Sequence, residues 1–232
     1  MSIKTLTTLL LFFTISFQLK SVMADDYSDT MALVDQSTIL IKSFGEDPNM
    51  VWFRDNVQYA KAVFVVPQML KAGFIFGGSG GSGVLISRNM KTNVWSYPVF
   101  YSMGSVSFGL QIGGEVSQVV LMVMSDKGMD SLLTTSFKLG ADATVAAGPV
   151  GQGAKAATAD ILAFARSKGA FAGMSIEGAI IKPRDKWNAA YYKQPVSPAD
   201  IVIRNAVTNP QADKLRQAVA EQSTLKTDKV KY

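Results

Sequence analysis

Gly77-Gly78-Ser79-Gly80-Gly81-Ser82-Gly83 runs directly into Val84-Leu85-Ile86, and this stretch decides the fold class. A phosphate-binding P-loop needs a lysine and a hydroxyl directly after its glycines, and a dinucleotide-binding loop needs its glycines between a strand and a helix. Here the glycines are followed by an apolar run that is typical of a strand. The stretch therefore favours a flexible hairpin, or a close approach between two backbones, over nucleotide binding.

The surrounding residues 71–182 contain every glycine of the chain except Gly45, with short β-rich runs between the glycines. Apolar and polar side chains alternate over 106–112, the pattern of a half-buried strand, and the apolar run 119–124 predicts a strand buried on both faces. Further strands are expected over 83–87, 99–101, 139–147, 161–166 and 171–181. One helix is expected to run from Asp126, as its cap, to Phe137. Many short strands separated by glycines indicate an antiparallel sheet, sandwich or barrel.

The two ends of the chain have helical patterns. Asp47-Pro48 is typical of an N-cap followed by a first-turn proline, and apolar residues then recur every three or four positions. This spacing predicts an amphipathic helix over 47–66 that ends at Pro67. Ser197-Pro198 and Asn209-Pro210 repeat the capping pattern and predict C-terminal helices. The sequence thus predicts an α+β fold, with N- and C-terminal helices flanking a glycine-rich antiparallel sheet or barrel-like core, as one domain over 25–222 before a polar tail over 223–232.

Residues 1–24 have the organisation of a secretory signal peptide. Lys4 precedes an almost unbroken apolar run over 6–17, and Val22-Met23-Ala24 places small residues at the −3 and −1 positions of a cleavage site. An uncleaved membrane anchor is the alternative, but a spanning helix needs roughly 20 apolar residues. We therefore expect cleavage after Ala24 and export to the periplasm or out of the cell. The exported chain could then lie peripherally on a membrane.

The chain has no histidine and no cysteine, which excludes Ser-His-Asp and Cys-His catalysis, disulfides, zinc–thiolate sites and lipoprotein anchoring. Calcium or magnesium could still be held by oxygen ligands. The carboxylates considered for acid–base work, Asp126 with Asp130 and the separate Glu115 and Glu177, favour structural roles. A Ser/Lys pair has no convincing motif. We therefore expect no enzyme activity, no cofactor and no metal site, with a carboxylate or Ser/Lys hydrolase as the remote alternative.

Charge is unevenly distributed along the chain. Removal of residues 1–24 takes away Lys4 and Lys20, which lowers the formal net charge from +5 to +3. An acidic segment over 25–55 then precedes a mildly basic body over 56–184, which could attract anionic lipid or phosphate or could simply be solvated surface. Nucleic acid is not expected as a partner, because no dense Lys/Arg stretch is interleaved with aromatic residues.

Aromatic and basic residues near the predicted helix suggest a membrane-contact surface. Trp and Tyr suit an interface with one apolar and one wet side, although core packing is the more common role of such residues. The residues chosen for lipid contact on this basis are Trp52, Phe53, Lys61, Lys71, Arg88 and Lys91.

Several ordered blocks carry a family resemblance. They are Lys71-Ala72-Gly73-Phe74, Gly80-Gly81-Ser82-Gly83-Val84-Leu85, Trp95-Ser96-Tyr97-Pro98, Gly109-Leu110-Gln111-Ile112-Gly113-Gly114-Glu115, Ala146-Ala147-Gly148-Pro149-Val150-Gly151, Ser167-Lys168-Gly169-Ala170-Phe171-Ala172-Gly173, and Glu177-Gly178 with Asn188-Ala189-Ala190-Tyr191-Tyr192. Together they resemble the SYLF domain, over about residues 57–207. The sequence departs from the family pattern at Lys193, where a glycine often follows the tyrosine pair, and at Lys91-Thr92-Asn93.

The resemblance implies binding of membrane lipids, since eukaryotic SYLF proteins bind phosphoinositides and yeast adaptors of the family bind actin filaments. Exported bacterial members resemble this chain in having a signal peptide and the domain alone. The resulting expectation is a non-catalytic protein that binds anionic membrane lipids. The alternative is a protein-interaction module, with actin as the partner if the protein reaches a host cytoplasm.

Overall fold

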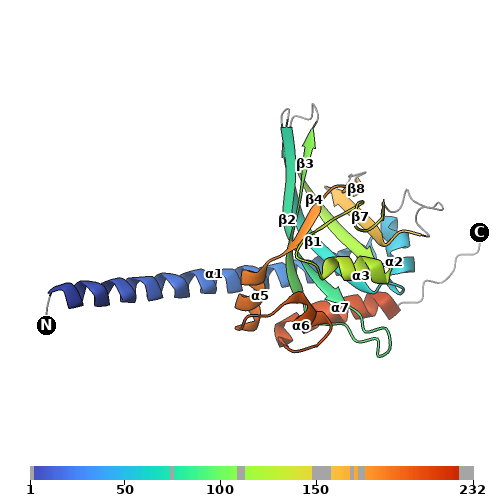
Figure 1. The fold of residues 1–232 in the computed structure, drawn as a ribbon. Coiled ribbons are helices and arrows are strands. Elements are labelled where there is room, and N and C mark those ends of the chain that lie inside the picture. The colour runs from blue at the N-terminus through green and yellow to red at the C-terminus, as the bar shows by residue number, and fades with distance from the viewer. Residues whose placement is uncertain are drawn as a thin grey trace, which may run out of the picture.

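The protein was examined as a computed structural model that describes residues 3–73, 76–108, 113–147, 158–167, 170–171 and 176–224, with backbone only over 3–24 and at 73, 76, 107–108, 113 and 170–171. Its centre is a curled, nine-stranded sheet with the order β5-β9-β3-β2-β1-β4-β7-β6, and β8 also pairs with β7 (Figure 1). The strands are β1 (Ala62–Gly73), β2 (Phe76–Ser87), β3 (Val99–Phe108), β4 (Gly113–Val123), β5 (Phe137–Lys138), β6 (Val145–Ala147), β7 (Ile161–Ser167), β8 (Ala170–Phe171) and β9 (Ile180–Pro183). Every described pair is antiparallel except β6 with β7.

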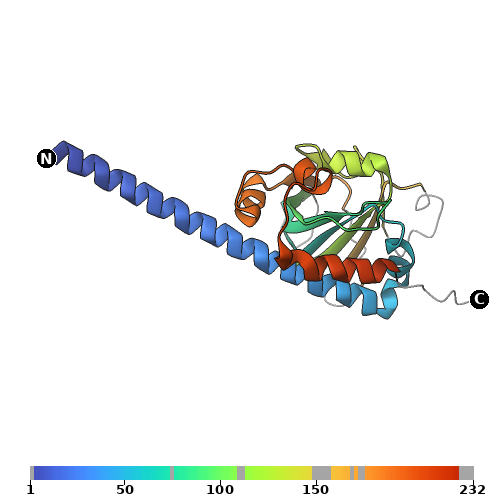
Figure 2. The same ribbon diagram turned by 90° about the horizontal axis from the view of Figure 1, so that it is seen from below.

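Helices flank this sheet, which confirms the predicted α+β class. They are α1 (Ile3–Glu46), η1 (Pro48–Met50), α2 (Val51–Val57), α3 (Asp126–Leu132), α5 (Asp185–Tyr192), α6 (Pro198–Val202), η2 (Pro210–Ala212) and α7 (Asp213–Thr224). The C-terminal half of α1 lies beside α7 on one side of the sheet, α3 lies on the other side, and the N-terminal half of α1 extends away from the body (Figure 2).

Helices cover both faces of the sheet in its lower part, as drawn in Figure 1. On the α1 side, Phe100 of β3 packs against Tyr191 of α5, and Phe164 of β7 packs against Phe53 of α2. On the α3 side, Phe64 of β1 packs against Tyr101, whose hydroxyl donates to the Leu132 carbonyl at 2.6 Å. Residues 119–123 of β4 are buried on both faces, as predicted.

The predicted helix over 47–66 is wrong beyond Val57. Asp47 does accept a hydrogen bond from the Asn49 amide and so caps η1, but α2 ends at Val57 and Ala62 begins β1. The run 62–66 is fully buried between β2 and β4, where β-branched side chains pack well. Pro67 lies at a β-bulge of this strand, a position that tolerates the missing backbone donor.

The glycine-rich stretch is not a hairpin, because it lies inside β2 and pairs with β1 on one side and β3 on the other. The alternative prediction, a close backbone approach, is confirmed at two positions. A Cβ on Gly81 would lie 2.5 Å from the Gln68 carbonyl oxygen, and one on Gly83 would lie 2.6 Å from the Val65 carbonyl oxygen. Glycine is therefore required here by crowding, not by turn geometry.

Three other boundaries differ from prediction. Ser125, not Asp126, caps α3, since its hydroxyl accepts from the Gly128 amide, and this helix ends at Leu132 before Phe137 enters β5. The strand expected over 139–147 is confined to β6, because residues 140–142 form a turn with Gly140 at φ +84°. The strand expected over 171–181 is divided between the end of β8 and β9.

The capped C-terminal helices are confirmed. Ser197 and Asp200 form a reciprocal capping box for α6, and Asn209 caps η2, which leads into α7. Several residues of the family-like blocks, at 74, 109–112, 148–151, 168–169 and 172–173, lie outside the described residues.

Candidate functional site

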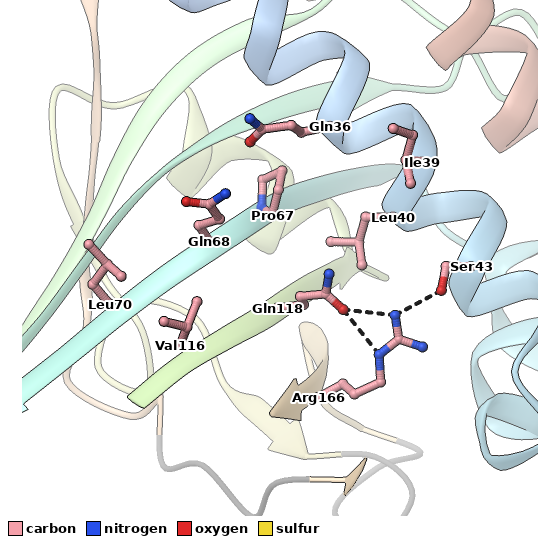
Figure 3. Close-up of a pocket in the computed structure, with 10 residues that line it drawn as sticks. All are labelled: Gln36, Ile39, Leu40, Ser43, Pro67, Gln68, Leu70, Val116, Gln118 and Arg166. Carbon is pink, nitrogen blue, oxygen red and sulfur yellow. Dashed lines mark hydrogen bonds between the residues drawn. The ribbon is translucent and has the colours of Figure 1, made fainter. Parts of the chain in front are cut away.

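An open groove runs along α1 on the helix side of the sheet. A hollow of about 660 Å³ lies between α1 and strands β1, β4 and β7 (Figure 3). Its lining residues are Gln36, Ile39, Leu40, Ser43, Pro67, Gln68, Leu70, Val116, Gln118 and Arg166. A second hollow of about 360 Å³ shares Gln36, Gln68 and Leu70 with the first, so the two form one groove.

The floor of the groove continues into an uncovered part of the sheet. Leu70 pairs with Gly80 and Val116, Gly80 pairs with Gly104, and Gly104 pairs with Ile180, so these residues form one cross-strand row. Opposed residues of neighbouring strands point to the same face. We call the exposed apolar residues of this face, Leu70, Val106, Val116 and Ile180, the projecting sheet face.

Exposure of the projecting sheet face follows from the length of the strands. β1 to β4 extend beyond the helices that cover their lower halves (Figure 1). Leu70 is 58 % exposed and Val116 is 50 % exposed, while Val106 reaches 84 %. The alternation over 106–112 had placed Val106 on the buried side of its strand. That prediction is wrong, because none of the helices in the described part of the chain covers this end of the face.

Arg166 closes one end of the groove. Its Nη1 lies 2.9 Å from Asp47 Oδ2, its Nη2 donates to Ser43 Oγ at 2.8 Å, and Nε and Nη2 both donate to Gln118 Oε1. The Asn49 backbone amide and the Arg166 guanidinium together hold the pKa of Asp47 below its usual value. This cluster joins β7 and β4 to the end of α1. The charges of Arg166 and Asp47 cancel within it.

Arg184 lies near the other end of the groove, beside Ser82 and Trp187 of the second hollow. Its Nη1 donates to Ser82 Oγ at 2.6 Å, and its guanidinium lies 3.2 Å from the centre of the Trp187 ring. Trp187 in turn donates from Nε1 to Asp26 at 2.9 Å. Burial lowers the pKa of Arg184, against the opposing effect of the nearby Asp26 and Asp29 carboxylates. Neither arginine was selected by the sequence analysis, since neither stands in a motif that indicates a binding role.

The two aromatic residues chosen for lipid contact belong to the packed body. Phe53 is fully buried and packs edge-on against Phe44 and Phe164. Trp52 is half-buried, with its ring 5.8 Å from that of Phe164. Phe53 therefore has no surface to offer a membrane in this fold, contrary to the expectation that both rings lie at an interface.

The four basic residues chosen with them fall into two places. Lys61, Arg88 and Lys91 lie at one end of β1 and β2, where the Arg88 amide donates to the Lys61 carbonyl and Lys61 pairs with Asp126 at 2.6 Å. Lys71 is ten residues along β1 from Lys61, which places it roughly 33 Å away at the rise of a β-strand. The six predicted residues therefore do not form a single site.

The end of the sheet that holds Lys61 and Arg88 carries apolar residues that sequence reasoning missed. Met90 and Val94 are each about half exposed on the turn between Arg88 and Trp95, beside Lys91. Asn89 Oδ1 accepts from the amides of Lys91 and Thr92 and so fixes this turn. We call Lys61, Arg88, Met90, Lys91 and Val94 the turn surface.

The carboxylates considered for catalysis are not gathered at the groove. Glu177 is exposed, and Glu115 is half-buried with a long contact of 3.4 Å to Ser117 Oγ. Over the part of the chain that the structure describes, no group of three or more acidic residues could hold a metal ion. Among the same residues, no helix combines the length and apolar character needed to cross a bilayer.

Comparison with known proteins identifies relatives of this chain. A family model described as "Ysc84: Las17-binding protein actin regulator" matches residues 104–222. "Protein YSC84" of Saccharomyces cerevisiae is 32 % identical over 190 residues, which cover 76 % of this chain and 40 % of the relative. "LAS seventeen-binding protein 3" of the same yeast is 34 % identical, covering 62 % of this chain and 34 % of its own length.

A human relative, "SH3 domain-containing YSC84-like protein 1", is 31 % identical over 153 residues, covering 63 % of this chain and 44 % of its own length. The chain thus spans less than half the length of each of these relatives.

Proposed function

Since the chain belongs to the Ysc84 (SYLF) family, whose model is described as an actin regulator, we propose that it is a non-catalytic protein-binding module with actin as its partner. The observation that carries the proposal is the projecting sheet face beside the α1 groove. Contiguous exposed apolar surface on a soluble body is typical of protein contact sites. The glycine floor at Gly80 and Gly104 leaves this surface flat, so that a broad partner surface can approach the backbone.

Actin-filament co-sedimentation tests the proposal. We expect the protein to pellet with filaments, and the double substitution of Leu70 and Val116 by Asp to weaken binding at least ten-fold, because buried carboxylates would face apolar partner atoms. Ile203→Asp is the matched control, since Ile203 is 60 % exposed but directly follows α6, a helix that lies below the sheet in Figure 1. No pelleting with filaments would overturn the actin proposal.

A second function, contact with anionic membrane lipid, is favoured by the turn surface. Met90 and Val94 could enter the interfacial region while Lys91 and Arg88 face lipid phosphates. Against this, Lys61 is paired with Asp126 and Arg88 donates to the Gln58 carbonyl, so only part of the charge is free for lipid.

Vesicle co-sedimentation separates the two ends of β1. Met90→Asp combined with Lys91→Glu should abolish pelleting with phosphatidylserine vesicles at low salt, whereas Lys71→Glu should leave it unchanged. Loss of binding in Lys71→Glu with the turn variant unaffected would move the lipid site to the projecting end of the sheet. Failure of the unmodified protein to pellet would reject lipid binding.

Export is a further part of the proposal. The predicted cleavage site after Ala24 falls within α1, directly before Asp25, Asp26 and Tyr27. The contacts of Asp26 with Trp187 and of Tyr27 with Tyr191 begin just after it, so cleavage there would keep the described packing of α1. Mass spectrometry of the protein purified from its producing cell should give a chain starting at Asp25, and an intact residue 1–24 segment would reject the signal peptide.

A further inference from the structure

The solvent-facing side of α1 carries a short stripe of unpartnered residues. Asp35, Ile39 and Lys42 are spaced by four and three positions, so they lie on one face of the helix. All three are exposed, and Ile39 is 69 % accessible despite its large apolar side chain. Ile39 also forms part of the α1 wall of the groove (Figure 3).

The charges of the stripe are free to pair with another molecule. Within the described part of the chain, neither Asp35 nor Lys42 takes part in an ion pair or a side-chain hydrogen bond. They stand two helical turns apart with Ile39 between them, in the order acid, apolar, base. A partner that presents base, apolar and acid in the same direction would therefore match the stripe.

A second copy of α1 in the antiparallel orientation has this pattern, because reversing the helix exchanges the acid and the base. We propose that two copies of the chain associate through this stripe about a two-fold axis close to Ile39. Asp35 of each protomer then faces Lys42 of its partner, so the contact contains two equivalent ion pairs, as an isologous interface requires. The two Ile39 side chains meet near the axis at the mouth of the grooves, and their burial supplies the apolar contribution.

The inference goes beyond the proposed function and does not depend on it. Pairing through α1 leaves the turn surface free, and a dimer would present two projecting sheet faces to a partner. Such a particle could hold two filaments together, whereas a monomer could only coat one. Self-association is measured without actin or lipid, so its failure is distinguishable from failure of either proposed binding activity.

The absence of cysteine from the sequence allows a direct test by cross-linking. Ile39→Cys introduces a single thiol near the proposed axis, where two Cα atoms can approach within the distance that a disulfide needs. Mild oxidation of the protein purified after expression of the full chain should give a covalent dimer in non-reducing electrophoresis. Ile203→Cys, at a residue that is 60 % exposed and follows α6, should remain monomeric under the same conditions.

Charge reversal tests the pairing geometry by sedimentation velocity. Asp35→Lys should raise the dimer dissociation constant about ten-fold, because it places like charges opposite each other at two equivalent positions. Adding Lys42→Asp should restore association to near the original level, and high salt should weaken it. A monomeric unmodified protein overturns the proposal, as does association that Asp35→Lys leaves unchanged or cross-linking equal at positions 39 and 203.

Discussion

Replacement of Gly83 by alanine tests whether crowding between β1 and β2 explains the glycines of the central sheet. An added Cβ would lie 2.6 Å from the Val65 carbonyl oxygen and 2.6 Å from Phe64 Cε2. Non-bonded carbon atoms prefer separations of about 3.5–4.0 Å, so both neighbours would have to move by close to an ångström. The Phe64 ring is fully buried against Tyr101, and the Val65 backbone is held in the sheet, so neither can yield freely.

Overpacking of a buried site typically costs about 1–3 kcal/mol, and we expect Gly83→Ala to lie at the upper end, near 3 kcal/mol, because one of its clashes is with backbone. Gly80→Ala is the matched control in the same strand, since its Cβ would have nothing nearer than the Met103 carbonyl oxygen at 4.0 Å. We expect its effect to stay within about 0.5 kcal/mol, with reduced unfolded-state entropy as a stabilising contribution.

Urea unfolding followed by tryptophan fluorescence measures both variants, with unchanged m-values showing that the comparison is between similar folded states. Equal free energies of unfolding for Gly83→Ala and Gly80→Ala would refute the crowding argument. In that case the glycines would have to be explained by strand flexibility. A Gly83→Ala protein that also carries Phe64→Leu should lose less stability than the two single changes together, because the smaller side chain removes one of the two clashes.

Three further changes address the polar contacts that hold the groove and the core. Arg166→Met should lower the free energy of unfolding by about 3 kcal/mol, because it leaves the poorly exposed Asp47 carboxylate unpaired. Arg204→Met, which breaks the exposed pair with Asp200, should have a much smaller effect in the same urea titration. Asp160 is desolvated, yet hydrogen bonds from Ser125 and Thr144 hold its pKa below the ordinary 3.8, so its stabilising contribution is complete above that pH and is lost as the pH falls through the folded-state value. Asp160→Asn should therefore reduce stability at neutral pH and flatten its fall below pH 3.8, and an unchanged acid profile would contradict this assignment. Tyr101→Phe should cost about 1–2 kcal/mol, measured by thermal unfolding, because it leaves the buried Leu132 carbonyl without its donor.

Local signals were sufficient where a contact lies within a few residues of its cause. Ser197 and Asp200 are three positions apart, and their reciprocal cap forms as the sequence indicates. The buried strand β4 was equally clear because 119–123 is an unbroken apolar run in a glycine-rich region. The cap depends on backbone geometry that the neighbouring residues determine by themselves, whereas β4 was recognised from the glycine-rich sequence around its apolar run.

β1 could not be identified in the same way. Its apolar residues continue the three- and four-residue spacing of α2, and a short run buried on both faces is compatible with a helix or a strand. The choice is made by pairing, since Phe64 lies opposite Leu85 of β2 and Leu121 of β4, residues that are distant in the sequence. Tertiary pairing therefore overrides a periodicity that was helical only by coincidence.

The candidate site was hidden from sequence reasoning for a related reason. Alternation fixes which residues share a face of a strand, but only the covering elements decide whether that face is dry. Val120 and Val116 of β4 share one face, yet Val120 is fully buried and Val116 is half exposed, because the helices cover only the lower part of the sheet. In this fold a binding surface can consist of the same residue types, valine and leucine, as the core. The first residues to mutate are therefore those that continue a buried face beyond the helices that cover it, such as Leu70 and Val116. The exposed lysines suggested by composition come second.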